Sequence, residues 1–173
     1  MIISVEGFKK YVKTTETDEV LEAKLQALEL LVRTYTNNNF QLRSFRTVGS
    51  FKGGALHCDT SLFKEGDTIQ ISQSELNEGL MVIKDMTDGV IPCIGCFPED
   101  NVLITKVRYP ADVQMGVVNM LKWDLQNRDK VGIQAETLSR HSVTYFNMDG
   151  ENSVIGYPKS LLGFLKPYMK ARF

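Results

Sequence analysis

The feature that most constrains the fold is a change in the spacing of apolar residues along the chain. Residues 17–36 and 110–128 repeat their apolar side chains every three or four positions, which is the period of an amphipathic helix. Between them, residues 40–109 alternate apolar and polar side chains in short runs separated by glycine-containing turns, which is typical of strands. We therefore expect an α+β protein in which strands are inserted between two long helices.

The two helical stretches each carry one apolar stripe, so we expect them to pack against each other. Thr17 is the expected N-cap of the first helix, and the asparagines at 37–39 end it. Pro110 is the expected first residue of the second helix, and a shorter helix over residues 4–12 begins at Ser4. The residues expected to form this helical core are Leu21, Leu25, Leu28, Val32, Val113, Val117, Leu121 and Leu125.

The strand-patterned stretch is expected to form a small antiparallel, barrel-like subdomain. Its five predicted strands lie near residues 42–48, 67–72, 80–83, 89–94 and 102–107. A long insertion whose two ends meet adds little loop-closure entropy. We therefore expect residues 1–39 and 110–173 to form a small helical bundle with a C-terminal docking arm, and residues 40–109 to form the inserted subdomain.

The C-terminal stretch has the pattern of a docking segment. Residues 141–146 alternate and predict an extended strand, whereas residues 157–173 predict a short amphipathic helix with Pro158 in its first turn and a cationic end. His141 has serines nearby but no nucleophile elbow or oxyanion-forming glycine loop, so catalysis is not expected. The residues expected to contact a partner are Ser139, His141, Val143, Tyr145, Tyr157, Leu161, Leu162, Leu165, Lys166, Tyr168, Lys170, Arg172 and Phe173.

The three cysteines bear on the possible chemistry. Cys58, Cys93 and Cys96 are an odd number in a chain without a secretion signal, so we expect reduced thiols rather than a disulfide framework. They are weak zinc candidates, because a closed site takes about four ligands and His57, next to Cys58, would point to the opposite face of a strand. We expect no metal, no cofactor and no enzymatic activity.

Charge and hydropathy exclude some classes of partner. The net charge of -1 argues against exposed duplex nucleic acid as the main partner. No stretch approaches the roughly twenty apolar residues of a membrane-spanning helix, so we expect a soluble protein made in the cytoplasm. One alternative stays open: an OB-like barrel that binds nucleic acid through interleaved basic and aromatic residues. Those residues are Arg43, Phe45, Arg46, Phe51 and Lys52.

Three stretches of the chain together resemble the head-to-tail connector proteins of long-tailed bacteriophages. Residues 8–40 read FKKYVKTTETDEVLEAKLQALELLVRTYTNNNF, and residues 109–146 read YPADVQMGVVNMLKWDLQNRDKVGIQAETLSRHSVTYF. The chain closes with GYPKSLLGFLKPYMKARF at residues 156–173. The specific part of the resemblance is the order of these stretches, because no single motif in them is diagnostic.

The resemblance implies a small helical bundle whose subunits form a ring, usually of twelve, under the portal at the head–tail junction of the virion. Such a ring extends the DNA channel, through which DNA passes without sequence-specific binding, and offers a platform to the next neck or tail protein. Residues 139–146 and 157–173 are then the portal-facing and neighbour-facing parts. Residues 40–109 replace a brief loop of the shorter family members, and we expect them to project toward a neighbouring subunit or the tail-side partner.

Overall fold

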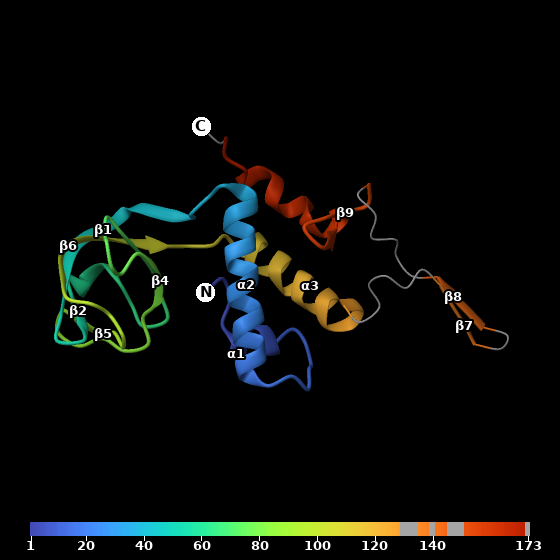
Figure 1. Cartoon of the computed structure of the whole chain (residues 1–173), viewed down its shortest axis with the longest axis horizontal. Coiled ribbons are helices and arrows are strands. Elements are labelled where there is room, and N and C mark those ends of the chain that lie inside the picture. The colour runs from blue at the N-terminus through green and yellow to red at the C-terminus, as the bar shows by residue number, and fades with distance from the viewer. Residues whose placement is uncertain (129–134, 139–140, 145–150, 172–173) are drawn as a thin grey trace. The chain divides into compact units, whose positions relative to one another are not determined.

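The computed structural model describes residues 1–128, 135–138, 141–144 and 151–171, and it mixes helices and strands as an α+β protein does (Figure 1). The chain divides into two compact units. Unit 1 comprises Met1 and Asn39–Tyr109, and unit 2 comprises Ile2–Asn38 and Pro110–Phe173. Unit 1 contains the largest sheet, and unit 2 contains the helices α1, α2 and α3.

The first two helices of unit 2 begin where the sequence predicts. Ser4 caps α1 (Val5–Lys9) and Thr17 caps α2 (Asp18–Thr36), each by accepting a hydrogen bond from a backbone N–H of the first turn. Asn37 ends α2 in the left-handed conformation, with φ at +49°. An asparagine tolerates this conformation better than most residues, so the run of asparagines ends the helix by its backbone preference.

The third helix, α3 (Ala111–Asn127), packs with α2 to form the core of unit 2. The prediction that Pro110 is its first residue is wrong by one position, because Pro110 has an extended ψ of 155° and is the N-cap. Of the eight expected core residues, seven are buried and Leu125 is half-buried. The helical period therefore identified the packed faces of both helices.

Unit 1 contains a curled, six-stranded antiparallel sheet with the strand order β4-β3-β6-β1-β2-β5. Strand β2 is absent from the sequence-based expectation, and its residues Ala-Leu-His do not alternate. A two-glycine turn at Gly53 and Gly54 joins it to β1. The strands are β1 (Gln41–Lys52), β2 (Ala55–His57), β3 (Thr68–Ser72), β4 (Gly79–Val82), β5 (Val90–Pro92) and β6 (Glu99–Val107).

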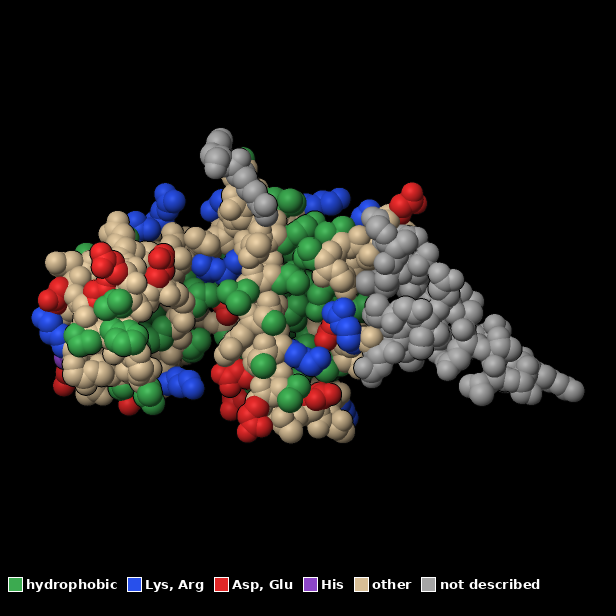
Figure 2. All heavy atoms as spheres, in the orientation of Figure 1, with side chains coloured by type: hydrophobic (Ala, Val, Ile, Leu, Met, Phe, Trp, Pro, Cys, Tyr) green, Lys and Arg blue, Asp and Glu red, His purple; other side chains and the backbone are tan. Residues whose placement is uncertain are grey.

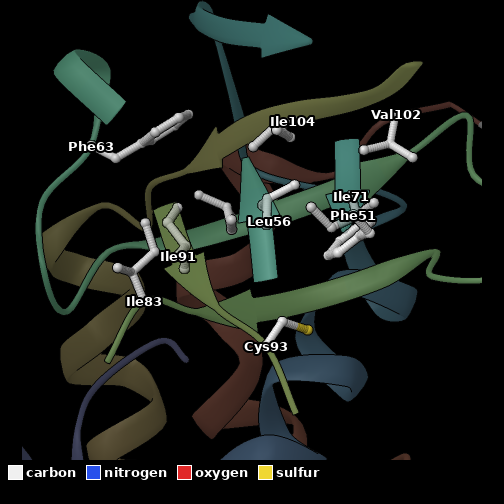
Figure 3. Packing of buried hydrophobic residues seen from close by; sticks show 10 residues of the cluster. Phe51, Leu56, Phe63, Ile71, Ile83, Ile91, Cys93, Val102 and Ile104 are labelled. Carbon is white, nitrogen blue, oxygen red and sulfur yellow. The ribbon is translucent and has the colours of Figure 1, made fainter. Parts of the chain in front are cut away.

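The core of unit 1 is a cluster of apolar side chains contributed by strands far apart in the sequence. Figure 3 shows Phe51, Leu56, Ile71, Ile91 and Ile104 pointing toward one another from β1, β2, β3, β5 and β6. All five are buried. Because each strand contributes only one or two of these side chains, the core forms only when the distant strands pair.

The described part of the chain also contains smaller elements. A 3₁₀ turn, η1 (Thr60–Leu62), belongs to unit 1, and a longer 3₁₀ helix, η3 (Lys159–Tyr168), lies near the C-terminus. Two separate hairpins are β7 (Ala135–Leu138) with β8 (His141–Thr144), and β9 (Ser153–Val154) with β10 (Tyr157–Pro158). Among the described helices, none combines the length and the apolar character that crossing a membrane requires.

Candidate functional site

The C-terminal helix η3 is part of the core of unit 2. Leu162 and Leu165 are 3% and 0% exposed, and Tyr157 just before the helix is 6% exposed. The ring of Phe164 lies over Gly116 of α3, so closely that a Cβ at this glycine would fall 2.3 Å from a ring carbon. The expectation that Tyr157, Leu162 and Leu165 contact a partner therefore conflicts with their burial inside their own chain.

A cluster of charged and aromatic side chains joins the helices of unit 2 around Asp124, which is buried on α3. Lys24 of α2 donates to one carboxylate oxygen at 3.0 Å, and Arg128 and the Tyr157 hydroxyl donate to the other at 2.6 and 3.3 Å. The Arg128 guanidinium also lies 5.0 Å from the Tyr157 ring centre and 5.5 Å from that of Trp123. Trp123 is thus part of this cluster.

The charges of this cluster shift the pKa values of its members. Burial alone would raise the pKa of Asp124, but hydrogen bonds from Lys24 and Arg128 outweigh it and hold the pKa below its ordinary value. Burial and the Asp124 charge raise the pKa of Tyr157 to about 12. The carboxylate is therefore ionised and the phenol neutral at physiological pH, which is the arrangement of a structural anchor rather than of a proton-transfer pair.

The end of η3 is held to α2 and α3 by polar contacts that the sequence pattern did not indicate. The Tyr168 hydroxyl donates to the Asp112 carboxylate at 2.7 Å, and the Lys170 N–H donates to the carbonyl of Thr36 at 2.8 Å. The side-chain amides of Asn37 and Asn38 donate to the carbonyls of Ala171 and Tyr168. The asparagines that end α2 therefore also bind the C-terminal segment. The sequence could not indicate this role, because it depends on the C-terminal segment packing beside α2.

The remaining residues that were expected to contact a partner differ in their exposure, and some lie outside the described residues. Lys166 and Lys170 are exposed, Leu161 and Tyr168 are half-buried, and Met169 beside them is 52% exposed. His141 and Val143 lie in β8, which begins where the extended strand was predicted. Ser139, Tyr145, Arg172 and Phe173 lie outside the described residues. Among the described residues of η3 and the segment after it, the expected docking residues that are exposed are therefore Lys166 and Lys170.

The β7–β8 hairpin forms a two-stranded sheet by itself. Ala135 pairs with Thr144 and Leu138 with His141, and neither strand joins another strand of the described chain. Only the β8 half was expected, because four residues of β7 show too little alternation to identify. A lone two-stranded hairpin is marginally stable in water. Among the described residues, no third strand pairs with either outer edge of this one.

The structure corrects the expectation that all three cysteines are reduced thiols. Cys93 and Cys96 form a disulfide across a turn in which Gly95 has a φ of +81°. That left-handed glycine turns the four-residue segment back on itself, so that the two side chains converge. Cys58 is the free cysteine, and burial followed by the Asp59 charge raises the pKa of its thiol to about 11. The described residues contain no cluster of three or more metal-ligating side chains.

A groove of about 490 Å³ lies in unit 1 between β4 and the loop after β5. Its lining includes the buried ring of Phe51, all four residues of β4 and the Cys93–Cys96 segment. Leu76 and Ile94 line the groove; Leu76 is 58% exposed and Ile94 is fully exposed. Figure 2 shows hydrophobic side chains exposed on unit 1 with acidic side chains close by. Exposed apolar side chains along a groove are typical of an interaction site.

The surface considered for nucleic-acid binding is only partly available. Arg43, Phe45 and Arg46 are exposed, and the Lys106 ammonium lies 5.7 Å from the centre of the Phe45 ring. Phe51, however, is 2% exposed in the core of the sheet, so the expectation that it stacks on a base is wrong. Lys52 pairs with Asp100 at 2.9 Å, which partly neutralises its charge.

Comparison with known proteins adds no relative: the chain matches no protein-family model and no curated protein.

Proposed function

We propose that this protein is a structural, non-enzymatic connector that forms a ring under a bacteriophage portal, extends the DNA channel and carries the neck or tail. In this proposal unit 2 is the helical adaptor core, unit 1 is an inserted barrel-like subdomain, and the virion's head–tail junction is the location. The ring has about twelve copies, as the resemblance of the sequence to head-to-tail connectors implies. DNA passes through it without sequence-specific binding.

The observation that carries the proposal is the β7–β8 hairpin, which lies between α3 and the C-terminal segment and pairs with no other described strand. Such an element suits a ring subunit, because backbone pairing between subunits would satisfy the outer edges of the hairpin and fix the register of the assembly. The helices of unit 2 are cross-linked by the Asp124 cluster, which suits a rigid structural component.

The exposed end of the C-terminal segment supports contact with a second protein, the portal. Lys166 and Lys170 are exposed there, and Met169 between them adds apolar area. A cationic rim around an apolar side chain suits an acidic protein surface, where charge sets the rate and register of docking more than the final affinity. Arg172 and Phe173, which follow in the sequence, add one more basic and one more aromatic residue.

The test combines native mass spectrometry with negative-stain imaging of the chain alone and mixed with its portal. We expect a cyclic assembly, either free or seeded by the portal. Deletion of residues 157–173 is a poor variant because it removes buried Leu162 and Leu165 from the core. Charge reversal at exposed Lys166 and Lys170 is better, and it should abolish portal binding without lowering the melting temperature. Lys13→Glu, an exposed lysine between α1 and α2, is the matched control.

A chain that stays monomeric with the portal present would overturn this proposal.

The second candidate function is nucleic-acid binding by unit 1. It is favoured by the exposed Arg43, Phe45 and Arg46 and by the Lys106 ammonium over the Phe45 ring. Salt-dependent binding of single-stranded DNA, lost in Arg43→Glu with Arg46→Glu, would support it. The absence of binding at low salt would remove it.

A further inference from the structure

The two edges of the six-stranded sheet in unit 1 are not equivalent. Strand β5 ends one edge and β4 ends the other. On β5, the outward N–H and C=O of Val90 both bond to Thr87, at 2.9 and 3.0 Å, and the next outward residue is Pro92, which has no N–H. An edge closed by a local turn and a proline cannot extend the ladder. The β5 edge is therefore protected.

The β4 edge carries no such protection. Ile83, just after the strand, donates its N–H to the Asp67 carbonyl at 2.9 Å, so residues at odd positions of β4 bond toward β3. Backbone groups alternate in direction along an antiparallel strand, so the N–H and C=O groups of Leu80 and Val82 point away from the sheet. Strand β4 contains no proline and no charged residue. It offers two donors and two acceptors for a further strand.

The surroundings of this edge fit an added strand rather than open water. The groove is lined by all four residues of β4, by the buried Phe51 and Ile71, and by the exposed Leu76 and Ile94. Its rim is fixed, because Asn77 and Ser74 on one side bond to Phe97 and Glu99 on the other. A strand laid along β4 would gain backbone hydrogen bonds and also bury exposed apolar side chains, the two sources of affinity in strand addition.

We infer that the β4 edge receives the β7–β8 hairpin of a second copy of the chain. The hairpin has unpaired outer edges among the described residues, and its strands match β4 in length at four residues each. The donor lies in unit 2 and the acceptor in unit 1, so the contact joins two different surfaces. Such a head-to-tail contact generates a ring when the rotation between neighbouring copies closes. The inference rests on the proposed ring and names the contact between its subunits.

The first test measures amide hydrogen exchange in the full chain at low and high concentration, with native mass spectrometry of the same samples. Unpaired edge amides of Leu80 and Val82 exchange quickly in a monomer. We expect them and the amides of residues 135–144 to become protected together as the oligomer forms. An oligomer in which Leu80 and Val82 still exchange quickly would overturn the inference and leave the proposed ring intact.

Two variants block the edge in different ways. Leu80→Pro removes an outward N–H without breaking the ladder to β3, and Leu80→Asp places a charge in the groove. Both should lose the oligomer while keeping the circular-dichroism melting curve of a folded chain. Val48→Asp is the control, because Val48 is 56% exposed on β1, pairs with Leu103 of β6 and does not line the groove. Retention of the oligomer in both folded Leu80 variants would contradict the inference.

A third measurement does not need the ring. A labelled peptide of residues 133–146 added to the full chain should bind and protect Leu80 and Val82, whereas the same peptide with Thr137→Pro and Val143→Pro should not. If the chain never oligomerises, even with the portal, but binds this peptide, the proposed function fails and the edge contact stands. If the peptide does not bind and the edge amides are protected at every dilution, the hairpin pairs within its own copy, and the second-copy contact is wrong.

Discussion

The side-chain amide of Asn77 forms hydrogen bonds with both the N–H and the C=O of Phe97, as a residue on a neighbouring strand would. Its Nδ2 donates to the Phe97 carbonyl at 2.9 Å, and the Phe97 N–H donates to its Oδ1 at 2.8 Å. The same Nδ2 reaches Glu99 at 2.8 Å, where Ser74 and the Glu75 N–H also donate. These hydrogen bonds lower the pKa of Glu99, and the one from Ser74 has the largest effect. One asparagine thus connects the two loops beside the groove.

Asn77→Ala should loosen the groove rim without unfolding unit 1. It removes three hydrogen bonds in a partly exposed site, so we expect a loss of about 1–2 kcal/mol in the free energy of unfolding. Exchange of the Phe97 amide should become faster, which hydrogen-exchange mass spectrometry would measure. Glu78→Ala, at the exposed neighbouring position, is the control. Unchanged protection of the Phe97 amide would show that Asn77 does not hold the rim.

Gly116→Ala should dislodge the C-terminal helix. A Cβ at this position would meet three ring atoms of Phe164 at 2.3–2.4 Å, so the ring must move. Overpacking of this kind destabilises by about 1–3 kcal/mol. Gly163→Ala is the matched control on η3, because a Cβ there meets nothing within 4 Å. Chemical denaturation of both variants checks the prediction, and equal stabilities would contradict the packing of Phe164 on α3.

Asp124→Asn should destabilise unit 2 in a way that depends on pH. It leaves Lys24 and Arg128 without their carboxylate, and because both cations are partly exposed we expect a loss of about 2 kcal/mol at neutral pH. The folded chain holds the pKa of Asp124 below its unfolded value, so this stabilisation is present above about pH 4 and is lost as the pH falls through the folded pKa. Denaturation curves of both proteins should therefore converge in acid. A difference that stays constant with pH would contradict the role of the carboxylate.

The thiols should show two kinds of behaviour. With its pKa raised to about 11, Cys58 has roughly a hundredfold smaller thiolate fraction near pH 8 than an ordinary cysteine, so its alkylation in the folded chain should be slow. Denaturation without reductant should expose one reactive thiol, because Cys93 and Cys96 are paired. Mass spectrometry after iodoacetamide treatment counts the labels. Three labels under these conditions would show that the pair is reduced.

The helices of unit 2 could be predicted from the sequence because their signals are local. Caps such as Thr17 and apolar stripes such as Leu21, Leu25 and Leu28 act within one or two turns of the chain. The strands of unit 1 were located for the same reason, wherever they were long enough to alternate. The residues of β2 and β7 do not alternate, and these strands are identified only through their partners.

The candidate sites depended on contacts that no local pattern contains. Leu162 and Leu165 have the sequence of an apolar docking face, but the return of the chain past α3 buries them. The pairing of Cys93 with Cys96 required the turn at Gly95, and the groove required β4 and β5 to become the two ends of one curled sheet. Whether an apolar side chain is exposed or buried depends on the whole fold. The sequence could therefore identify candidate docking residues but could not show which of them are exposed.

The entry and exit of unit 1 are fastened to each other. The rings of Phe40 and Tyr109 lie 5.0 Å apart, and the Arg108 N–H donates to the Phe40 carbonyl at 3.0 Å. For the helices on either side, seventy residues therefore behave as a short closed loop. A change in the length of unit 1 between these two residues should therefore leave the packing of α2 on α3 unaltered.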